Sequence, residues 1–102
     1  MVIDVNQPAS KTVVINNTTG LHLRPAGLFA KLASTFDAQI EIVKGDRRAN
    51  GKSILDIITL DAEGGSEICI EASGSDAEAS LAALAELVEH GFATEEQTEQ
   101  TN

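Results

Sequence analysis

The chain has 102 residues, of which 16 are acidic, 7 are basic and 42% are hydrophobic. This length fits one domain with a single core, which excludes a multidomain enzyme, because two separate cores would each bury too little surface to be stable. A net charge of −9, with three Phe as the only aromatic residues, excludes nucleic acid as a direct ligand. The charge is uneven, since residues 1–52 carry all seven bases and residues 53–102 carry twelve acids and no base.

The N-terminus has no basic start followed by a long apolar run, and no stretch approaches the roughly 20 apolar residues of a membrane span. We therefore expect a soluble cytoplasmic protein without membrane insertion. The single cysteine, Cys69, lies between two isoleucines, where a small buried hydrophobic residue is the common case. It predicts neither a disulfide framework nor a metal cluster.

In chain order, residues 11–16 are rich in β-branched residues and end at Asn-Thr-Thr-Gly, which predicts a first strand. Residues 25–35 follow as a helix, with Pro25 at its first position, where the missing N–H costs nothing. The helical stripe at positions i, i+3, i+4 and i+7 consists of Phe29, Leu32, Ala33 and Phe36. Residues 38–43 and 47–50 then form a predicted hairpin.

Residues 53–60 predict a short helix that is apolar nearly all round, with Ser53 as its N-cap. Residues 66–72 alternate as a fourth strand with one apolar face. Residues 75–78 (Ser-Asp-Ala-Glu) fit a capping box, and Gly91 closes the helix that follows. The apolar face of that last helix contains Leu81, Leu84 and Val88.

The order of elements is thus βαββαβα, which places the chain in the α+β class. An open-faced β-sandwich is the economical packing, with a four-stranded antiparallel sheet and all helices on one face, because each strand has only one apolar side. We assign residues 11–92 to this domain, residues 1–10 to an N-terminal extension and residues 93–102 to a flexible polar tail.

The segment Gly-Leu-His22-Leu23-Arg24-Pro-Ala places a histidine and an arginine directly before a predicted helix. The first N–H groups of a helix lack intrahelical partners and lie at its positive end, so an anion near His22 would meet free donors together with Arg24. A neutral imidazole is also a competent nucleophile near neutral pH. A lone histidine at such a place is, however, usually an ordinary polar loop residue, and His90 is too far along the chain for metal-ligand spacing with it.

The motif Gly-Leu-His-x-Arg-Pro-Ala after a first strand resembles the active-site signature of the HPr family, the histidine phosphocarriers of the bacterial phosphoenolpyruvate-dependent phosphotransferase system. The resemblance extends over roughly residues 11–92. It includes Lys-Ser-Ile-Leu at 52–55, Leu60 after the second helix, and Glu-Ala-Ser-Gly at 71–74. It implies the same open-faced β-sandwich and a stoichiometric phosphoryl carrier rather than an enzyme, with no metal and no organic cofactor.

The resemblance assigns roles to three positions. His22 is similar to the histidine that enzyme I phosphorylates at Nδ1, and Arg24 to the arginine that contacts the phosphoryl group. Ser53 is similar to the serine that a dedicated kinase/phosphorylase modifies, although a helix N-cap would explain a serine there equally well. Leu23 replaces a commoner small residue or Thr, and Asp56 stands where regulated members often have Gly.

The short helix predicts a docking surface, because it can bury only one side while apolar residues surround it. Some of them should stay exposed beside His22. We expect Leu23, Ile54, Leu55 and Ile58 to contact partners, with the basic residues Arg24, Lys31 and Lys52 at the rim. The implied partners are enzyme I, an enzyme II A-type domain and a serine kinase, and we expect a monomer.

Two other functions stay open on the sequence. The nitrogen branch uses the same chemistry for regulation instead of sugar transport, and residues 37–38 (Asp-Ala) and 91–92 (Gly-Phe) resemble it, whereas residues 52–55 resemble the sugar branch. The second is a regulatory protein-binding module whose histidine is never phosphorylated.

Overall fold

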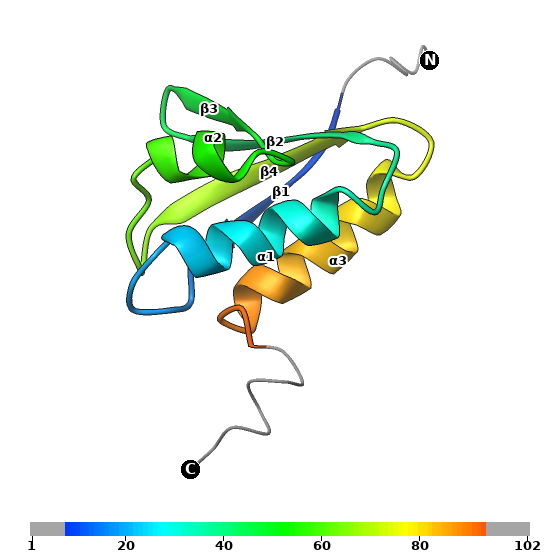
Figure 1. Cartoon of the computed structure of the whole chain (residues 1–102). Helices are drawn as coiled ribbons and strands as arrows, with labels where there is room; N and C mark the ends of the chain where they lie inside the picture. The colour runs from blue at the N-terminus through cyan, green and yellow to red at the C-terminus, as the bar shows by residue number, and fades with distance from the viewer. Residues whose placement is uncertain (1–7, 94–102) are drawn as a thin grey trace.

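The computed structural model describes residues 8–93, and the element order is βαββαβα as predicted (Figure 1). The elements are β1 (Ala9–Val14), α1 (Leu23–Ala33), β2 (Gln39–Lys44), β3 (Arg47–Asn50), α2 (Ile54–Thr59), β4 (Glu67–Ser73) and α3 (Ala77–Glu89). The first strand begins and ends two residues earlier than the pattern predicted. Most of the predicted extension and nearly all of the predicted polar tail lie outside the described residues.

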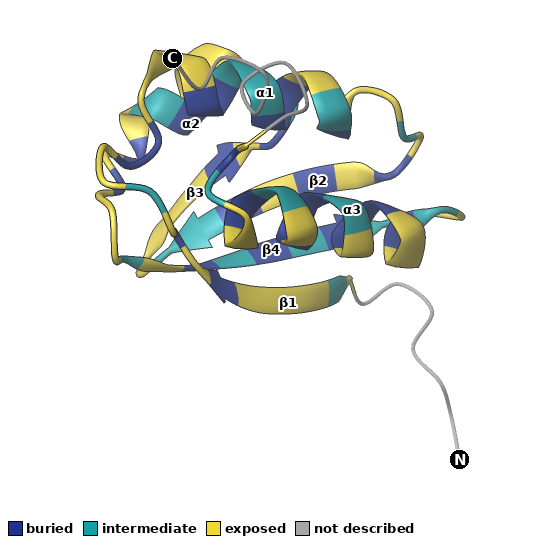
Figure 2. Ribbon diagram, turned by 90° about the horizontal axis from the view of Figure 1, so that it is seen from below, coloured by how far each residue is buried: buried dark blue, intermediate teal, exposed yellow. Residues whose placement is uncertain are grey.

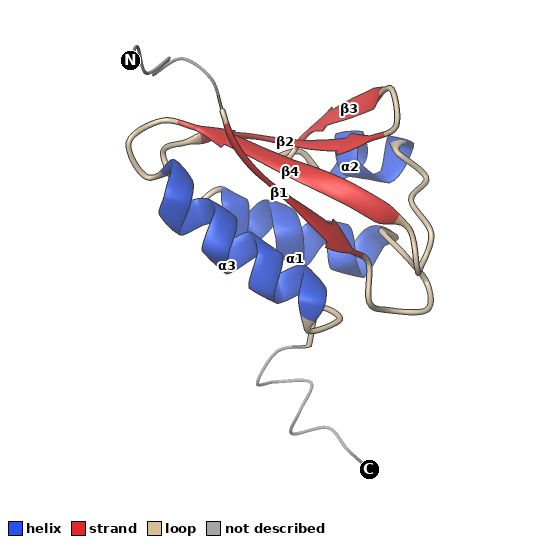
Figure 3. Ribbon diagram, turned by 180° about the vertical axis from the view of Figure 1, so that it is seen from behind, coloured by secondary structure: helices blue, strands red, loops and turns tan. Residues whose placement is uncertain are grey.

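The four strands form one antiparallel sheet in the order β1-β4-β2-β3, and all three helices lie on one face of it (Figure 3). The last strand, β4, lies between β1 and β2, pairing Ile70 with Lys11 on one side and with Ile42 on the other. The predicted open-faced α+β sandwich is therefore confirmed. Within residues 8–93, no helix combines the length and the hydropathy that a membrane crossing requires.

The core lies between the sheet and the helices, and strand alternation fills it from one side (Figure 2). Ile68 and Ile70 of β4 are buried on the helix side of the sheet, as predicted, while Glu67, Cys69 and Glu71 alternate with them on the outer side. The helices contribute Phe29, Ala33, Leu81, Leu84 and Val88, all buried. Cys69 lies on the outer side of the sheet and is half-buried, so it is not the small buried residue that its two isoleucine neighbours suggested.

The outer face of the sheet carries an ion-pair network. Glu41 of β2 and Glu71 of β4 are direct cross-strand partners, an arrangement that two like charges disfavour. Arg48 of β3 relieves it, because its Nη1 lies 2.8 Å from a carboxylate oxygen of each glutamate. Hydrogen bonds to Glu71 and then to Glu41 raise the pKa of Arg48 above its usual value, so the guanidinium stays charged.

The start of α3 differs from the predicted capping box. Asp76, not Ser75, occupies the N-cap position, and its side chain makes no cap hydrogen bond. Its two carboxylate oxygens instead accept from the backbone N–H groups of Asp37 and Ala38, each at 2.8 Å. A charged acceptor prefers two convergent donors to one, and folding brings the turn before β2 within its reach. Asp76 therefore joins the α1–β2 turn to α3.

We expect Asp76→Ala to lower the free energy of unfolding by about 1–3 kcal/mol, because it leaves two backbone donors without their charged acceptor. Ser75→Ala is the matched control and should change stability by only a few tenths of a kcal/mol, since Ser75 does not occupy the N-cap position. Urea denaturation followed by circular dichroism measures both. Equal losses for the two variants would contradict this role of Asp76.

Candidate functional site

The loop before α1 is anchored to the loop before β4. Gly20 has φ +78°, and a Cβ there would run into the carbonyl oxygen of Ala62, so only glycine fits. The next residue, Leu21, donates its N–H to the same carbonyl at 2.9 Å and buries its side chain. His22 follows directly, so its backbone is held at a fixed point of the fold.

His22 is the N-cap residue of α1 and its side chain is exposed. The imidazole makes no cap hydrogen bond to the first turn of α1. The first intrahelical bond runs from the N–H of Ala26 to the carbonyl of His22 at 2.9 Å. The residue is accessible to a second protein without any rearrangement of the backbone.

The first turn of α1 supplies unpaired donors next to this imidazole. The helix begins at Leu23, so Pro25 is its third residue rather than its first. That place suits proline equally well, because none of the first N–H groups of a helix has an intrahelical partner. The N–H groups of Leu23 and Arg24 have no backbone acceptor in the described chain. Together with the positive end of the helix, they favour an anion at His22.

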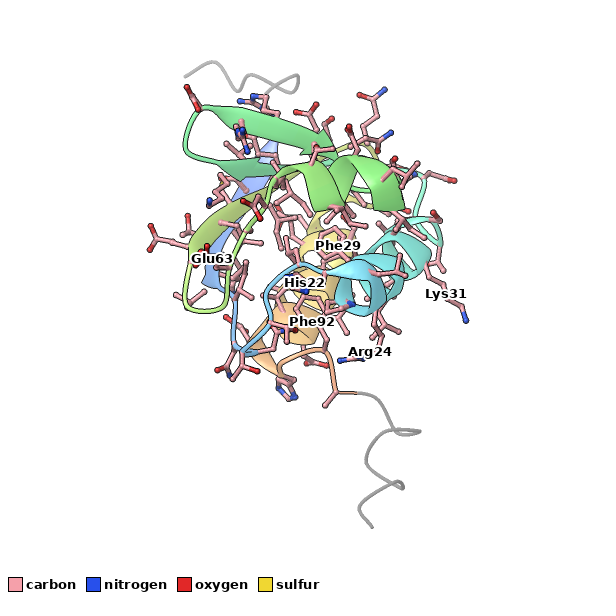
Figure 4. All side chains as sticks on the ribbon, turned by 60° about the vertical axis from the view of Figure 1, so that its left-hand side comes forward. His22, Arg24, Phe29, Lys31, Glu63 and Phe92 are labelled. Carbon is pink, nitrogen blue, oxygen red and sulfur yellow. The ribbon has the colours of Figure 1, made fainter. Side chains whose placement is uncertain are left out.

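Arg24 reaches from this first turn to the end of α3, since α1 and α3 run in opposite directions (Figure 1). Its Nη1 lies 3.5 Å from the carbonyl oxygen of Phe92, at the limit of a hydrogen bond. Figure 4 shows the two residues at the same end of the molecule. Within residues 8–93 Arg24 forms no ion pair, since the ion pairs found there belong to Arg48. Its guanidinium therefore keeps most of its donors for a ligand.

Phe92 is held rigidly where Arg24 meets it. The N–H of Phe92 donates to the carbonyl of Leu87 and that of Gly91 to the carbonyl of Val88, which is the hydrogen-bond pair of a Schellman motif. Gly91 has φ +67°, as its predicted helix-closing role requires, and the Phe92 ring is fully buried. The Asn16 amide donates to the carbonyl of Glu89 at 2.9 Å, which ties the loop before α1 to the same helix end.

The predicted docking residues divide between exposed and half-buried positions. Leu23 is 69% exposed and Leu55 is 76% exposed, whereas Ile54 is 38% exposed. Ile58 is half-buried against the core, and its neighbour Ile57 is fully buried. The prediction that α2 leaves part of its apolar surface in solvent is therefore confirmed. We call Leu23, Ile54 and Leu55 the apolar patch.

Ser53 caps α2 as predicted, because its Oγ accepts from the N–H of Asp56 at 3.2 Å. The Asp56 carboxylate in turn accepts from the N–H of Asn50 at 2.7 Å, which holds the turn before the helix. The sequence suggested that Lys52 is a free cation at the rim of the docking surface. Its Nζ instead donates to the carbonyl of Phe36 at 2.7 Å. Of the three predicted rim cations, Arg24 and Lys31 remain exposed.

Two contributors to the site were absent from the sequence prediction. Asn16 binds the carbonyl of Glu89, and Phe92 offers its carbonyl to Arg24. In the sequence, the Gly91-Phe92 pair indicated a role for Phe92, whereas no local pattern indicated one for Asn16. Within residues 8–93 no cluster of three or more His, Cys, Asp or Glu residues could hold a metal ion. The site itself offers an exposed imidazole, an arginine and a helix N-terminus.

Comparison with known proteins identifies similar chains. Residues 9–90 match the family described as "PTS HPr component phosphorylation site". The chain is 42% identical over 82 residues to the phosphocarrier protein NPr of Shewanella violacea, covering 80% of this chain and 90% of that protein. It is 39% identical over 85 residues to the phosphocarrier protein HPr of Treponema pallidum, covering 83% and 97% of the two chains. The crystal structure of HPr-C-His from Thermoanaerobacter tengcongensis superposes with a TM-score of 0.81 at 40% identity, covering 85% and 98%.

The anchored loop generates a stability prediction with a matched control. Gly20 and Gly65 both have positive φ, but a Cβ at Gly65 would meet nothing within 4 Å. Gly65→Ala should cost only the backbone penalty of about 1–2 kcal/mol. Gly20→Ala adds the collision with the Ala62 carbonyl and should cost more, which thermal unfolding of the two variants measures. Equal melting temperatures would show that the loop relaxes around the added methyl group.

Proposed function

The chain belongs to the HPr family of phosphocarriers of the phosphotransferase system, and from this membership we propose that His22 is the phosphoryl acceptor. In the proposed reaction, His22 takes the phosphoryl group from phosphorylated enzyme I and passes it to an enzyme II A-type domain. The protein is a stoichiometric intermediate of the cytoplasm, and it needs neither a metal ion nor an organic cofactor for this transfer.

The observation that carries the proposal is the exposed imidazole at a helix N-terminus whose first N–H groups are free. The lone pair of His22 Nδ1 forms the new P–N bond while the bond from phosphorus to the donor protein breaks, and its electron pair stays with the donor. No proton has to leave the nitrogen that attacks, because neutral imidazole carries its proton on the other ring nitrogen. The transfer to the acceptor protein reverses the same steps.

Arg24 supports the transferred group through its planar fork of N–H donors. The contact to the Phe92 carbonyl is long, so the guanidinium can turn toward a phosphoryl group without losing a strong hydrogen bond. Charge-assisted bonds from Arg24 and the N–H of Leu23 then stabilise charge on the oxygens as the phosphoryl group moves. Arg24 thus serves the transfer chemistry rather than the stability of the fold.

The apolar patch supplies the docking surface for both partners in this proposal. Leu23 and Leu55 lose exposed apolar area when a partner covers them. Leu23 follows His22 directly in the chain, and Leu55 lies on α2, which packs against α1. Arg24 and Lys31 add positive charge at the rim, so partners with acidic groups around an apolar centre fit best. Ile58 contributes less, because the core already covers half of it.

Ser53 is proposed as a regulatory site at the edge of the apolar patch. A phosphate there sits at the start of α2, where backbone N–H groups stabilise its negative charge. The neighbouring Asp56 carboxylate repels the same charge. The phosphate should weaken the binding of partner proteins, because a hydrated dianion next to Ile54 and Leu55 must lose water when a partner binds. The fold itself should tolerate the modification.

The nitrogen-branch carrier is the second candidate, because the chain is 42% identical to an NPr protein and 43% identical to an HPr of known structure, so sequence identity leaves both branches open. The proposed chemistry at His22 is the same in both branches. The phosphorylated protein can be mixed with purified A-type domains of the sugar branch and of the nitrogen branch. The domain to which phosphoryl transfer is faster identifies the branch.

We expect His22→Ala to abolish acid-labile phosphorylation by enzyme I and phosphoenolpyruvate, with little change in melting temperature because the side chain is exposed. His90→Ala is the control, since His90 lies at the C-terminal end of α3 and should transfer normally. The measurement is retained radiolabel from phosphoenolpyruvate before and after mild acid. Labelling that survives in the His22 variant would refute the assignment.

We expect Ser53→Asp to slow phosphoryl transfer from enzyme I without lowering the melting temperature. Ser53→Ala should transfer normally but lose the N-cap hydrogen bond, which costs typically about 1 kcal/mol. Transfer kinetics at low salt, where charge repulsion is least screened, distinguish the two variants. If Ser53→Asp transfers as fast as the parent protein, the serine is a helix cap only.

A further inference from the structure

The loop between β1 and α1 lies against the loop between α2 and β4 (Figure 1), and Asn17 belongs to the first of these loops. Its backbone is fixed on the second loop. Two residues earlier, the N–H of Ile15 donates to the carbonyl of Ser66 at 2.9 Å. A Cβ added at Gly64 would collide with the carbonyl oxygen of Asn17 itself, so the two loops are in close contact there. The Asn17 side chain therefore starts from a rigid base.

The side chain of Asn17 holds the peptide group that joins Gly20 to Leu21. Asn17 Nδ2 donates to the carbonyl oxygen of Gly20 at 3.1 Å, and the N–H of Leu21 donates to the carbonyl of Ala62 at 2.9 Å. The same Nδ2 also donates to Thr19 Oγ1 at 3.1 Å. We call the two hydrogen bonds on the Gly20–Leu21 peptide group the peptide clamp, because they hold both its oxygen and its nitrogen.

The peptide clamp prevents a rotation that glycine would permit. The close approach to Ala62 requires Gly20, which has φ +78°, and a residue without a Cβ leaves its own ψ angle poorly restricted. Rotation about this angle turns the peptide group that leads to Leu21 and His22. It would redirect the extended N-cap backbone of His22, with φ −80° and ψ −170°, and with it the imidazole.

The other polar atom of this side chain is unpaired. Asn17 Oδ1 is buried and has no hydrogen-bond partner in the part of the chain that the structure describes. A buried acceptor without a donor lowers stability, whereas the two bonds from Nδ2 raise it. Because these effects oppose each other, removal of the whole side chain should change the melting temperature little. The order of the Gly20–Leu21 peptide group should change more, since the loss of the Nδ2 donor acts directly on it.

We propose that Asn17 is a positioning residue for phosphoryl transfer, which acts through the peptide clamp on the imidazole of His22. The clamp follows from the hydrogen bonds alone, whereas its effect on transfer rests on the proposed function of His22. Misplacement of a reacting group by about 1 Å can slow a reaction about a hundredfold. The apolar patch belongs to α1 and α2, which pack against each other, so partner docking should survive the loss of the clamp.

The peptide clamp is tested in the full-length protein by amide hydrogen exchange, followed by ¹H–¹⁵N NMR. Asn17→Ala should speed exchange of the Leu21 amide roughly threefold to tenfold, which corresponds to the loss of one hydrogen bond. The Ile70 amide, in the middle of the sheet, should keep its rate. Thr18→Ala is the matched control, because Thr18 is the next residue of the same loop and is exposed. An unchanged Leu21 rate in Asn17→Ala would overturn the clamp.

The positioning role is tested by rapid mixing of phosphorylated enzyme I with an excess of the carrier. At saturating carrier, Asn17→Ala should accept the phosphoryl group roughly tenfold to a hundredfold more slowly than the parent, while the concentration for half-maximal rate should stay within about twofold. A merely structural role would not separate these two quantities. Thr18→Ala should match the parent in both.

The two measurements separate the parts of the proposal. Faster Leu21 exchange with an unchanged saturating rate would overturn the positioning role while leaving the peptide clamp in place. A raised half-maximal concentration with an unchanged saturating rate would assign Asn17 to docking and would overturn the positioning role as well. Failure of His22 to accept phosphate in the parent would instead strike the proposed function and would not alter the exchange result.

Discussion

The meeting of two helix ends of opposite polarity is the constraint on which the site depends. The positive start of α1 lies against the negative end of α3, because the two helices run antiparallel beneath one sheet. Asn16 and Arg24 each reach a carbonyl at that end of α3, those of Glu89 and Phe92. The pairing satisfies acceptors that helix geometry leaves open, and it leaves the donors at the start of α1 for an incoming anion.

Rigidity at this junction comes from backbone contacts. The Gly20 close approach and the Leu21 hydrogen bond attach the loop before α1 to Ala62. The Schellman motif fixes Phe92 on the other side. A carrier that hands the same group between two proteins benefits from such preorganisation, since each partner meets a binding surface that needs no ordering.

Charge is divided between the two faces of the molecule. On the outer side of the sheet, Arg48 lies between Glu41 and Glu71 and is neutralised within the domain. On the helical side, Arg24 and Lys31 have no carboxylate partner in the part of the chain that the structure describes. Unpaired cations beside exposed leucines suit association with an acidic partner, whereas a paired network suits a surface that stays in solvent.

Local patterns in the sequence determined the order of the elements, the apolar face of β4 and the His22 motif, because strand and helix periods and capping residues act over a few positions. Only the tertiary structure decided which backbone groups the charged side chains contact. Asp76 binds the turn before β2 instead of its own helix, Lys52 binds the Phe36 carbonyl, and Arg24 meets a carbonyl 68 residues away. A charged group takes the unsatisfied backbone partner that folding brings nearest, and no local pattern specifies that partner.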